Sequence, residues 1–96
     1  MASNFTVYTT PRFNRLAEDL AKHHQEFARA YERAIEILEV DPTNRNHDRD
    51  IKKLEDVDAG DGQYRLRVGR FRFRYDLPEE RVVLSWCGLR RENTYR

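Results

Sequence analysis

Alternating hydrophobic and polar positions mark the segment YRLRVGRFRFRY as a β-hairpin, with a two-residue loop at 69–70. Side chains in a strand point to opposite faces with a period of two, and a glycine at the first loop position suits a type II′ turn. We therefore expect Arg67 to face Arg72. One step further along the ladder, Arg65 faces Arg74 on the same side. We call this side the arginine face; the other side of the predicted sheet is apolar and aromatic.

The pattern elsewhere predicts two helices and further strands. Thr10 followed by Pro11 is a helix start signal, and apolar residues then recur at helical spacing to about Lys22. The spacing is interrupted at a His-His pair and resumes in a second predicted helix, from about Gln25 to Glu39. Short β-branched, aromatic or apolar runs predict strands at 5–9, 51–54 and 82–87.

These elements predict an α+β fold in one domain that spans residues 1–96. We expect the helices to form an antiparallel hairpin packed on the apolar face of a mainly antiparallel sheet of about four strands. If the loop before the last strand has four residues, Trp86 joins the apolar face. Ser85 and Cys87 then lie on the arginine face, where small side chains leave a concavity.

Charge is unevenly distributed between the two parts of the chain. Residues 1–62 carry nine basic and thirteen acidic side chains, a balance of −4, and residues 63–96 carry nine and four, a balance of +5. A basic strand part favours nucleic acid or an acidic protein as partner. Like charges opposite each other in a sheet repel by an amount on the order of 0.2–1 kcal/mol, so the arginine face favours a bound anion. The alternative is a solubilising surface, but the hairpin offers no carboxylate on this face before Asp76.

Composition narrows the classes of protein further. A single cysteine, Cys87, allows neither an internal disulfide nor a cysteine metal cluster, which suits a reducing cytosol. No basic start with an apolar run opens the chain, and nowhere do about 18 apolar residues follow one another, so we expect a soluble, cytoplasmic protein without membrane contact. His23 and His24 lack a third ligand at metal spacing, and we expect no metal or other cofactor.

The tail GLRRENTYR adds three arginines, two of them adjacent, and a penultimate tyrosine after the last predicted strand. With DIKKL, YRLRVGRFRFRYDL and VVLSW before it, nearly the whole chain resembles the RelE/ParE superfamily, the toxins of bacterial toxin-antitoxin operons. The resemblance implies a RelE-like ribonuclease fold and a cognate antitoxin protein as partner. RelE-like members cut messenger RNA in the decoding site of the ribosome, whereas ParE-like members inhibit DNA gyrase by binding.

The strand arginines and the tail tyrosine favour the RelE-like activity, a metal-independent mRNA endoribonuclease. By position, Arg65, Arg67 and Arg72 resemble the phosphate-contacting groups of those enzymes, and Tyr95 resembles their terminal tyrosine. Fixed guanidiniums stabilise the charge that develops on a phosphate during cleavage, but arginine does not give up its proton. Neighbouring arginines lower the pKa of a tyrosine toward neutrality, so Tyr95 is the first candidate for proton transfer.

Other polar residues have supporting or alternative roles. Leu89 occupies the position of a tail arginine in RelE itself, so Arg90 or Arg91 must replace that group. Glu92 is a second candidate base, and its alternative role is a salt bridge to one of these two arginines. The residues expected to bind RNA backbone are Lys52, Lys53, Arg74, Arg90 and Arg91. Two other functions stay open: gyrase inhibition of the ParE type, and binding of an acidic protein without toxicity.

Overall fold

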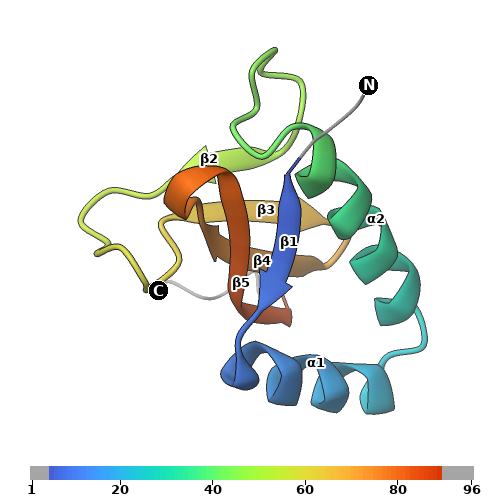
Figure 1. Cartoon of the computed structure of the whole chain (residues 1–96). Coiled ribbons are helices and arrows are strands. Elements are labelled where there is room, and N and C mark those ends of the chain that lie inside the picture. Colours follow the sequence, from blue (N-terminus) through green and yellow to red (C-terminus); the bar gives the residue numbers. More distant parts are fainter. Residues whose placement is uncertain (1–4, 90–96) are drawn as a thin grey trace.

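The computed structural model describes residues 5–89 and places two helices on one face of a five-stranded mixed sheet (Figure 1). The elements are β1 (Thr6–Thr9), α1 (Pro11–His23), α2 (Phe27–Val40), β2 (Ile51–Lys53), β3 (Tyr64–Val68), β4 (Phe71–Asp76), the short 3-10 helix η1 (Pro78–Glu80) and β5 (Arg81–Leu89). The strand order is β1-β5-β4-β3-β2. The α+β class is confirmed.

The sheet is larger than expected and partly parallel. β3, β4 and β5 form an antiparallel meander, and the short strand β2 extends it by pairing antiparallel with β3. At the other edge β1 pairs with β5 in parallel, with Val7 opposite Val82. The expected count of about four strands was too low because both short outer segments find a partner at an edge of the meander.

The first helix begins where the sequence predicts. Thr10 Oγ1 accepts a hydrogen bond from the Phe13 backbone N–H at 3.1 Å, and Pro11 lies in the first turn, where its missing N–H costs nothing. At the other end, Lys22 and His23 lie in the last turn of α1, beside the negative end of the helix dipole. The second helix starts and ends slightly later than expected.

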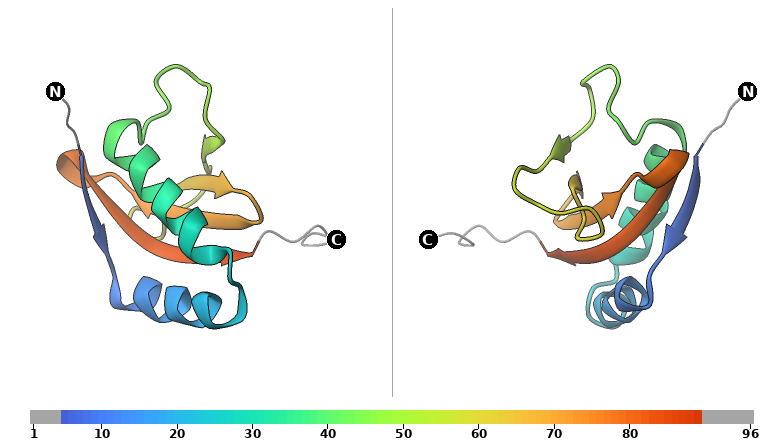
Figure 2. Two further views of the ribbon diagram at one scale, coloured as in Figure 1. Left: turned by 90° about the vertical axis from the view of Figure 1, so that its right-hand side faces the viewer. Right: turned by 60° about the vertical axis from the view of Figure 1, so that its left-hand side comes forward.

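The helices do not form the expected antiparallel hairpin. In Figures 1 and 2, α2 rises steeply from the end of α1, so the two axes form an open V. Helix α1 packs mainly against β5, whereas α2 packs against β1, β3 and β4. Phe13 and Tyr31 connect the helices, with ring centroids 5.5 Å apart. Each helix therefore buries its apolar side mainly on the sheet and not on the other helix. Because the sheet is twisted, its strands run in different directions at its two ends, and helices packed on different parts of it need not be antiparallel.

The core lies between the helices and the sheet and is rich in aromatic rings. Phe73 of β4 is fully buried, and its ring stacks near that of Phe27 in α2, with centroids 6.0 Å apart. Phe71 meets the same Phe27 ring edge to face at 5.2 Å. Tyr75 is also buried, and its hydroxyl donates a hydrogen bond to the Pro42 carbonyl at 2.7 Å. Burial raises the pKa of Tyr75 far above its ordinary value.

The last strand contains a β-bulge that the sequence pattern did not reveal. Tyr75 of β4 pairs with Leu84 of β5. Two residues earlier in β4, Phe73 pairs with Cys87, so β5 has one residue more than β4 in this interval. An extra residue reverses the alternation of side chains beyond it. Cys87 is therefore buried in the core and Trp86 lies on the arginine face, the reverse of the expected arrangement.

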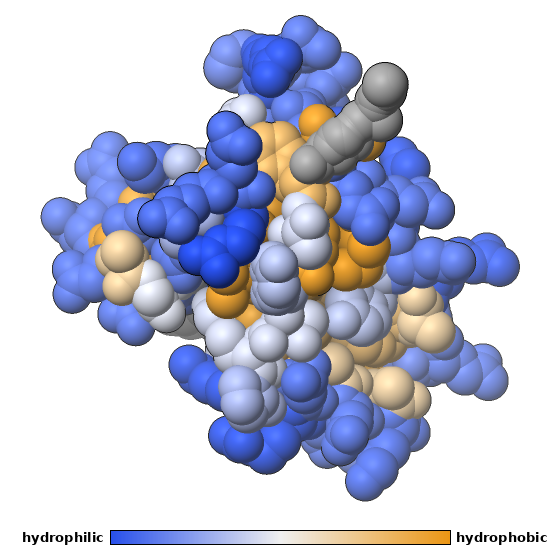
Figure 3. Space-filling model, in the orientation of Figure 1, coloured by the Kyte–Doolittle hydropathy of each residue, from blue (hydrophilic) through white to orange (hydrophobic). Residues whose placement is uncertain are grey.

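The outer surface is mostly hydrophilic on the side seen in Figure 3, with hydrophobic residues gathered between β1 and α2. Large exposed hydrophobic side chains in this structure include Tyr8, which is 47% exposed, and Val40, which is 57% exposed. Within residues 5–89, neither helix combines the length and the apolar character needed to cross a membrane.

Candidate nucleic-acid interface

The four hairpin arginines lie on one face of the sheet, as the alternation predicts, and they line a cleft. The concavity was expected beside Ser85 and Cys87, but neither residue lines this cleft. Arg65 pairs with Arg74 across β3 and β4. Arg67 pairs with Arg72, so all four side chains leave the sheet on one side. The cleft has a volume of about 360 Å³, and its lining consists of these four arginines with Lys52, Leu54 and Trp86. We call it the arginine cleft.

The tight hairpin loop fixes the pairing of the arginines. Gly69 has φ of +59°, the positive value that the first loop position of a type II′ turn requires. Val68 then pairs with Phe71, and the register follows along both strands. The predicted loop and register are confirmed.

A carboxylate that the sequence pattern did not predict forms ion pairs with two arginines of the cleft. Asp50 lies just before β2, and its Oδ2 is 3.1 Å from Arg67 Nε, while its Oδ1 is 3.6 Å from Arg65 Nη1. The Asp50 carbonyl also accepts a hydrogen bond from the Arg67 backbone N–H at 3.0 Å. The side chain is 51% exposed, so it is open to solvent and to a bound ligand. Asp50 is distant from the hairpin in sequence, and the pairing of β2 with β3 brings them together.

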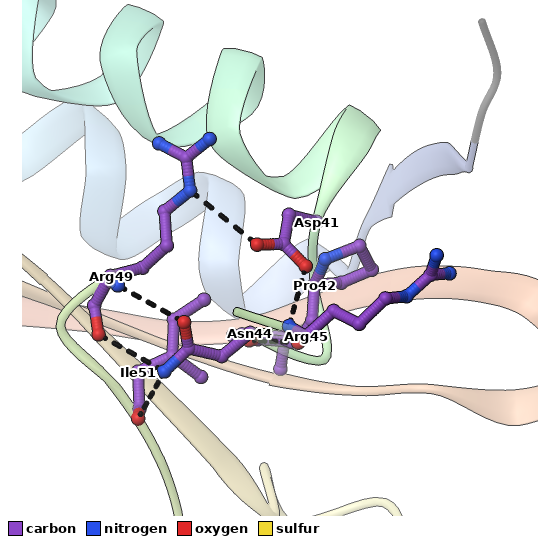
Figure 4. Close-up of polar contacts among 7 residues, drawn as sticks. Asp41, Pro42, Asn44, Arg45, Arg49 and Ile51 are labelled. Atoms are coloured by element: carbon purple, nitrogen blue, oxygen red, sulfur yellow. Dashed lines mark hydrogen bonds and ion pairs between the residues drawn. The ribbon is translucent and has the colours of Figure 1, made fainter. Parts of the chain in front are cut away.

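The loop before Asp50 is braced by its own polar groups (Figure 4). Asn44 adopts a left-handed conformation with φ of 57°; its Oδ1 accepts from the Arg49 N–H at 3.0 Å, and its Nδ2 donates to the Arg49 carbonyl at 3.1 Å. Asp41 Oδ1 accepts from the Arg45 N–H at 2.9 Å. The other oxygen of Asp41 lies 3.6 Å from Arg49 Nε. These contacts give Asp50 a defined position beside the cleft.

The arginines of the cleft differ in what holds them. Arg74 Nη2 donates to the backbone carbonyls of Asp61 at 3.2 Å and Gly62 at 3.0 Å, which ties the guanidinium to the loop before β3. Arg72 Nε is buried and has no hydrogen-bond partner within residues 5–89. Arg67 Nε is also buried and without a hydrogen-bond partner there, although the Asp50 carboxylate lies 3.1 Å from it. Buried polar atoms in folded proteins nearly always have a partner, so this arginine pair is less completely satisfied by the fold than Arg74 is.

Asp76 serves the loop rather than the arginines. Its carboxylate is 7% exposed and accepts from the backbone N–H groups of Gly62 at 2.9 Å and Gln63 at 3.1 Å. Gly62 has φ of +82°, and a Cβ built on it would lie 2.8 Å from Arg74 Cβ, so a side chain there meets both strain and collision. Arg74 and Asp76 together hold the end of the 54–63 loop against the sheet.

The two lysines of β2 that were predicted to bind RNA backbone lie on opposite faces of the sheet. Lys52 lines the arginine cleft. Lys53, the next residue in β2, places its Nζ 5.7 Å from the centroid of the Tyr64 ring and so lies on the other face, as strand alternation requires. The expectation that both lysines contact one RNA backbone therefore has a geometric basis for Lys52 alone. The other predicted residues lie outside the described part of the chain: Arg90, Arg91, Glu92 and Tyr95.

Trp86 and Cys87 exchange the roles that the sequence pattern predicted. Trp86, expected in the core, is partly exposed and lines the cleft opposite Arg74. Cys87, expected on the arginine face, is 2% exposed, and burial raises the pKa of its thiol to about 12. Cys87 is therefore a core residue and not a nucleophile. The pattern VVLSWC carries no local signal for the bulge.

Among residues 5–89, His, Cys, Asp and Glu side chains do not gather in groups of three or more that could hold a metal ion. The chain matches no family model, no curated protein and no solved structure. A proposal about its function therefore starts from the chemistry of the arginine cleft.

Proposed function

We propose that the arginine cleft binds the phosphate backbone of RNA and that the protein is a metal-independent endoribonuclease. More specifically, we propose that it acts as a RelE-like toxin, which cuts messenger RNA on the ribosome and is held inactive by a cognate antitoxin. The observation that carries the nuclease proposal is the convergence of four arginines and Lys52 on a single cleft, with a carboxylate ion-paired to two of these arginines. The ribosome and the antitoxin are expected from the resemblance of the sequence, and a cytoplasmic location is expected from its composition.

The guanidiniums supply what phosphate binding needs. Planar guanidinium forks match phosphate oxygens and form charge-assisted hydrogen bonds with them. Arg72 of β4 pairs with Arg67 of β3, and Arg65 lies two residues from Arg67 on the same side of the sheet, so these guanidiniums line one cleft. The strongest attraction to a polyanion is therefore centred on the β3–β4 hairpin, and binding should weaken as salt rises.

The same groups suit RNA cleavage by the adjacent 2′-hydroxyl. The 2′-oxygen attacks phosphorus, the bond from phosphorus to the 5′-oxygen breaks, and the products are a 2′,3′-cyclic phosphate and a 5′-hydroxyl. Negative charge grows on the nonbridging oxygens during this step. Guanidiniums that already point at those oxygens stabilise this charge without reorganising, and losing one such donor costs about 2.7–4 kcal/mol of transition-state stabilisation in well-studied sites.

Two proton transfers complete the reaction. The Asp50 carboxylate is the acceptor that the cleft offers to the 2′-hydroxyl, because it lies within the arginine cluster and is half exposed. The leaving 5′-oxygen must gain a proton, and arginine cannot supply it because its guanidinium does not give up a proton in proteins. By the resemblance, Tyr95 supplies it, with Glu92 as the alternative group.

A second candidate is a ParE-like inhibitor of DNA gyrase that acts by binding alone. The ion pairs of Asp50 with Arg65 and Arg67 favour it, because both carboxylate oxygens are already engaged by guanidiniums of the protein itself. In that case the cleft is a charged docking surface and no bond is broken.

Cleavage of a defined transcript in a translation extract, mapped by primer extension, tests the proposal. We expect Arg72→Ala to lower the rate of cutting by about 10²- to 10³-fold, and Tyr95→Phe to lower it strongly as well. Arg70→Ala is the matched control, because Arg70 lies at the hairpin tip, outside the cleft lining, and pairs with Glu26 at 2.7 Å. It should cut normally.

Normal cutting by both Arg72→Ala and Tyr95→Phe would contradict the proposed site. Intact transcripts together with inhibition of gyrase supercoiling by the purified protein would select the second candidate instead.

A further inference from the structure

We propose that Trp86 is a base-stacking residue and that it restricts the arginine cleft to unpaired nucleotides. This inference deepens the proposed function and rests on it, since it assumes that the anion in the cleft is a nucleic acid. The guanidiniums by themselves would bind any phosphate chain. An aromatic surface among them adds recognition of the bases.

The β-bulge is what brings the indole to the arginines. Without the extra residue in β5, Trp86 would point at the helices, as the alternation of the strand predicts. With it, Trp86 pairs with Arg74, and two residues further Gly88 pairs with Arg72. The side chains of Trp86 and the two arginines thus leave neighbouring strands on the same side of the sheet.

Gly88 determines where the indole lies. A Cβ built on Gly88 would be 2.5 Å from Trp86 Cη2 and 2.6 Å from Trp86 Cζ2, closer than real atoms approach. The six-membered ring of the indole therefore occupies the space that any other residue at position 88 would fill. The ring extends along β5 from the level of Arg74 toward the level of Arg72, and the side chain stays partly exposed within the cleft lining.

This arrangement matches the two parts of an unpaired nucleotide. Phosphate oxygens bind guanidiniums, and the flat face of a base stacks on an aromatic ring whatever the base is. In a duplex the base faces are covered by their neighbours, so a paired strand can use the arginines but not the indole. The other possible role of Trp86 is to cover the aliphatic stems of the arginines, which would create no dependence on bases.

The chain contains one tryptophan, so its fluorescence reports on this residue alone. The full-length protein is titrated with a short single-stranded RNA whose 2′-hydroxyls are methylated to prevent cleavage. It is also titrated with an abasic oligomer of equal length and charge, and with the duplex of the first strand. We expect the single strand to change the Trp86 emission and to bind roughly fivefold to a hundredfold more tightly than the abasic oligomer. The duplex should bind like the abasic oligomer and leave the emission unchanged.

Variants assign the effect to the ring, with binding followed by the anisotropy of a labelled strand. Trp86→Ala should lose the preference for the base-bearing strand while its affinity for the abasic oligomer stays the same, and Trp86→Phe should keep part of the preference. Arg72→Ala should weaken binding of both oligomers by the same factor. Circular dichroism checks that each variant is folded, and if Trp86→Ala does not fold, the wild-type comparison with the abasic oligomer decides.

Equal affinity of the wild type for the base-bearing and abasic strands would overturn the stacking role and leave the proposed cleavage intact. Failure to bind any of the three nucleic acids, together with intact transcripts in the extract, would overturn both.

Discussion

The two faces of β4 show how one strand divides its work between stability and recognition. Phe71, Phe73 and Tyr75 point to the helices and are buried in aromatic contacts. Arg72 and Arg74, which alternate with them, line the arginine cleft. Strand geometry forces this separation, because successive side chains point to opposite faces. The lesson is that a side chain on one face can be changed with little effect on the other.

Polar atoms on the two faces are satisfied in different ways. On the helix side, the buried Tyr75 hydroxyl donates to the Pro42 carbonyl at 2.7 Å, so its partner comes from the fold itself. On the cleft side, the Nε atoms of Arg67 and Arg72 are buried and have no hydrogen-bond partner within residues 5–89. An unsatisfied buried donor costs free energy, so the helix face contributes more to stability than the cleft face, whose arginines we assign to binding.

The largest effect on stability should come from the helix side. Phe73→Ala removes a fully buried ring between β4 and α2, and we expect the free energy of unfolding to fall by about 3–5 kcal/mol. Urea denaturation followed by circular dichroism measures it. Arg72→Ala, one residue away on the other face, is the matched control and should change stability far less. Similar losses for both variants would show that the two faces are not separable.

The reactivity of the Cys87 thiol tests whether the bulge places this residue in the core or on the arginine face. Because burial raises its pKa from 9.0 to about 12, the native protein should react very slowly with a thiol reagent at pH 8 and rapidly once unfolded. The unfolded chain loses this proton first as pH rises, so Cys87 should lower the free energy of unfolding progressively between about pH 9 and pH 12.

Other groups titrate in the same pH range, so the wild type is compared with Cys87→Ala, which should lack this part of the alkaline loss. Rapid labelling of the native thiol near neutral pH would place Cys87 on the arginine face and remove the bulge from our account.

The smallest expected effect is a difference in RNA binding between variants of two adjacent lysines. Lys52 lines the cleft and Lys53 lies over the Tyr64 ring on the opposite face. We expect Lys52→Ala to weaken RNA binding a few-fold and to reduce the slope of log affinity against log salt by about one, the change for one lost phosphate contact. Lys53→Ala should leave both unchanged. Affinities at several salt concentrations measure the difference, and equal slopes for the two variants would argue against the cleft as the binding face.

Much of the site could be predicted because its information is local. The hairpin has a strict period of two and a glycine at the turn, so the pairing of Arg67 with Arg72 follows from neighbours in sequence. The start of α1 is local in the same way, because the Thr10 cap and Pro11 act within one helical turn. The contact of Asp50 with Arg67 could not be found in this way, since it depends on a strand added after a long loop.

The α+β class, the helix start at Thr10 and the arginine face of the hairpin follow from the amino-acid sequence alone, because periodicity, capping and turn chemistry act over a few residues. Three features depend instead on the folded arrangement: the ion pairs of Asp50 with the cleft arginines, the parallel pairing of β1 with β5, and the bulge that places Trp86 beside the arginines and Cys87 in the core. These features could not be predicted because each depends on how segments distant in sequence pack together. A bulge in β5 is favourable only once its two neighbouring strands and the helices are in place.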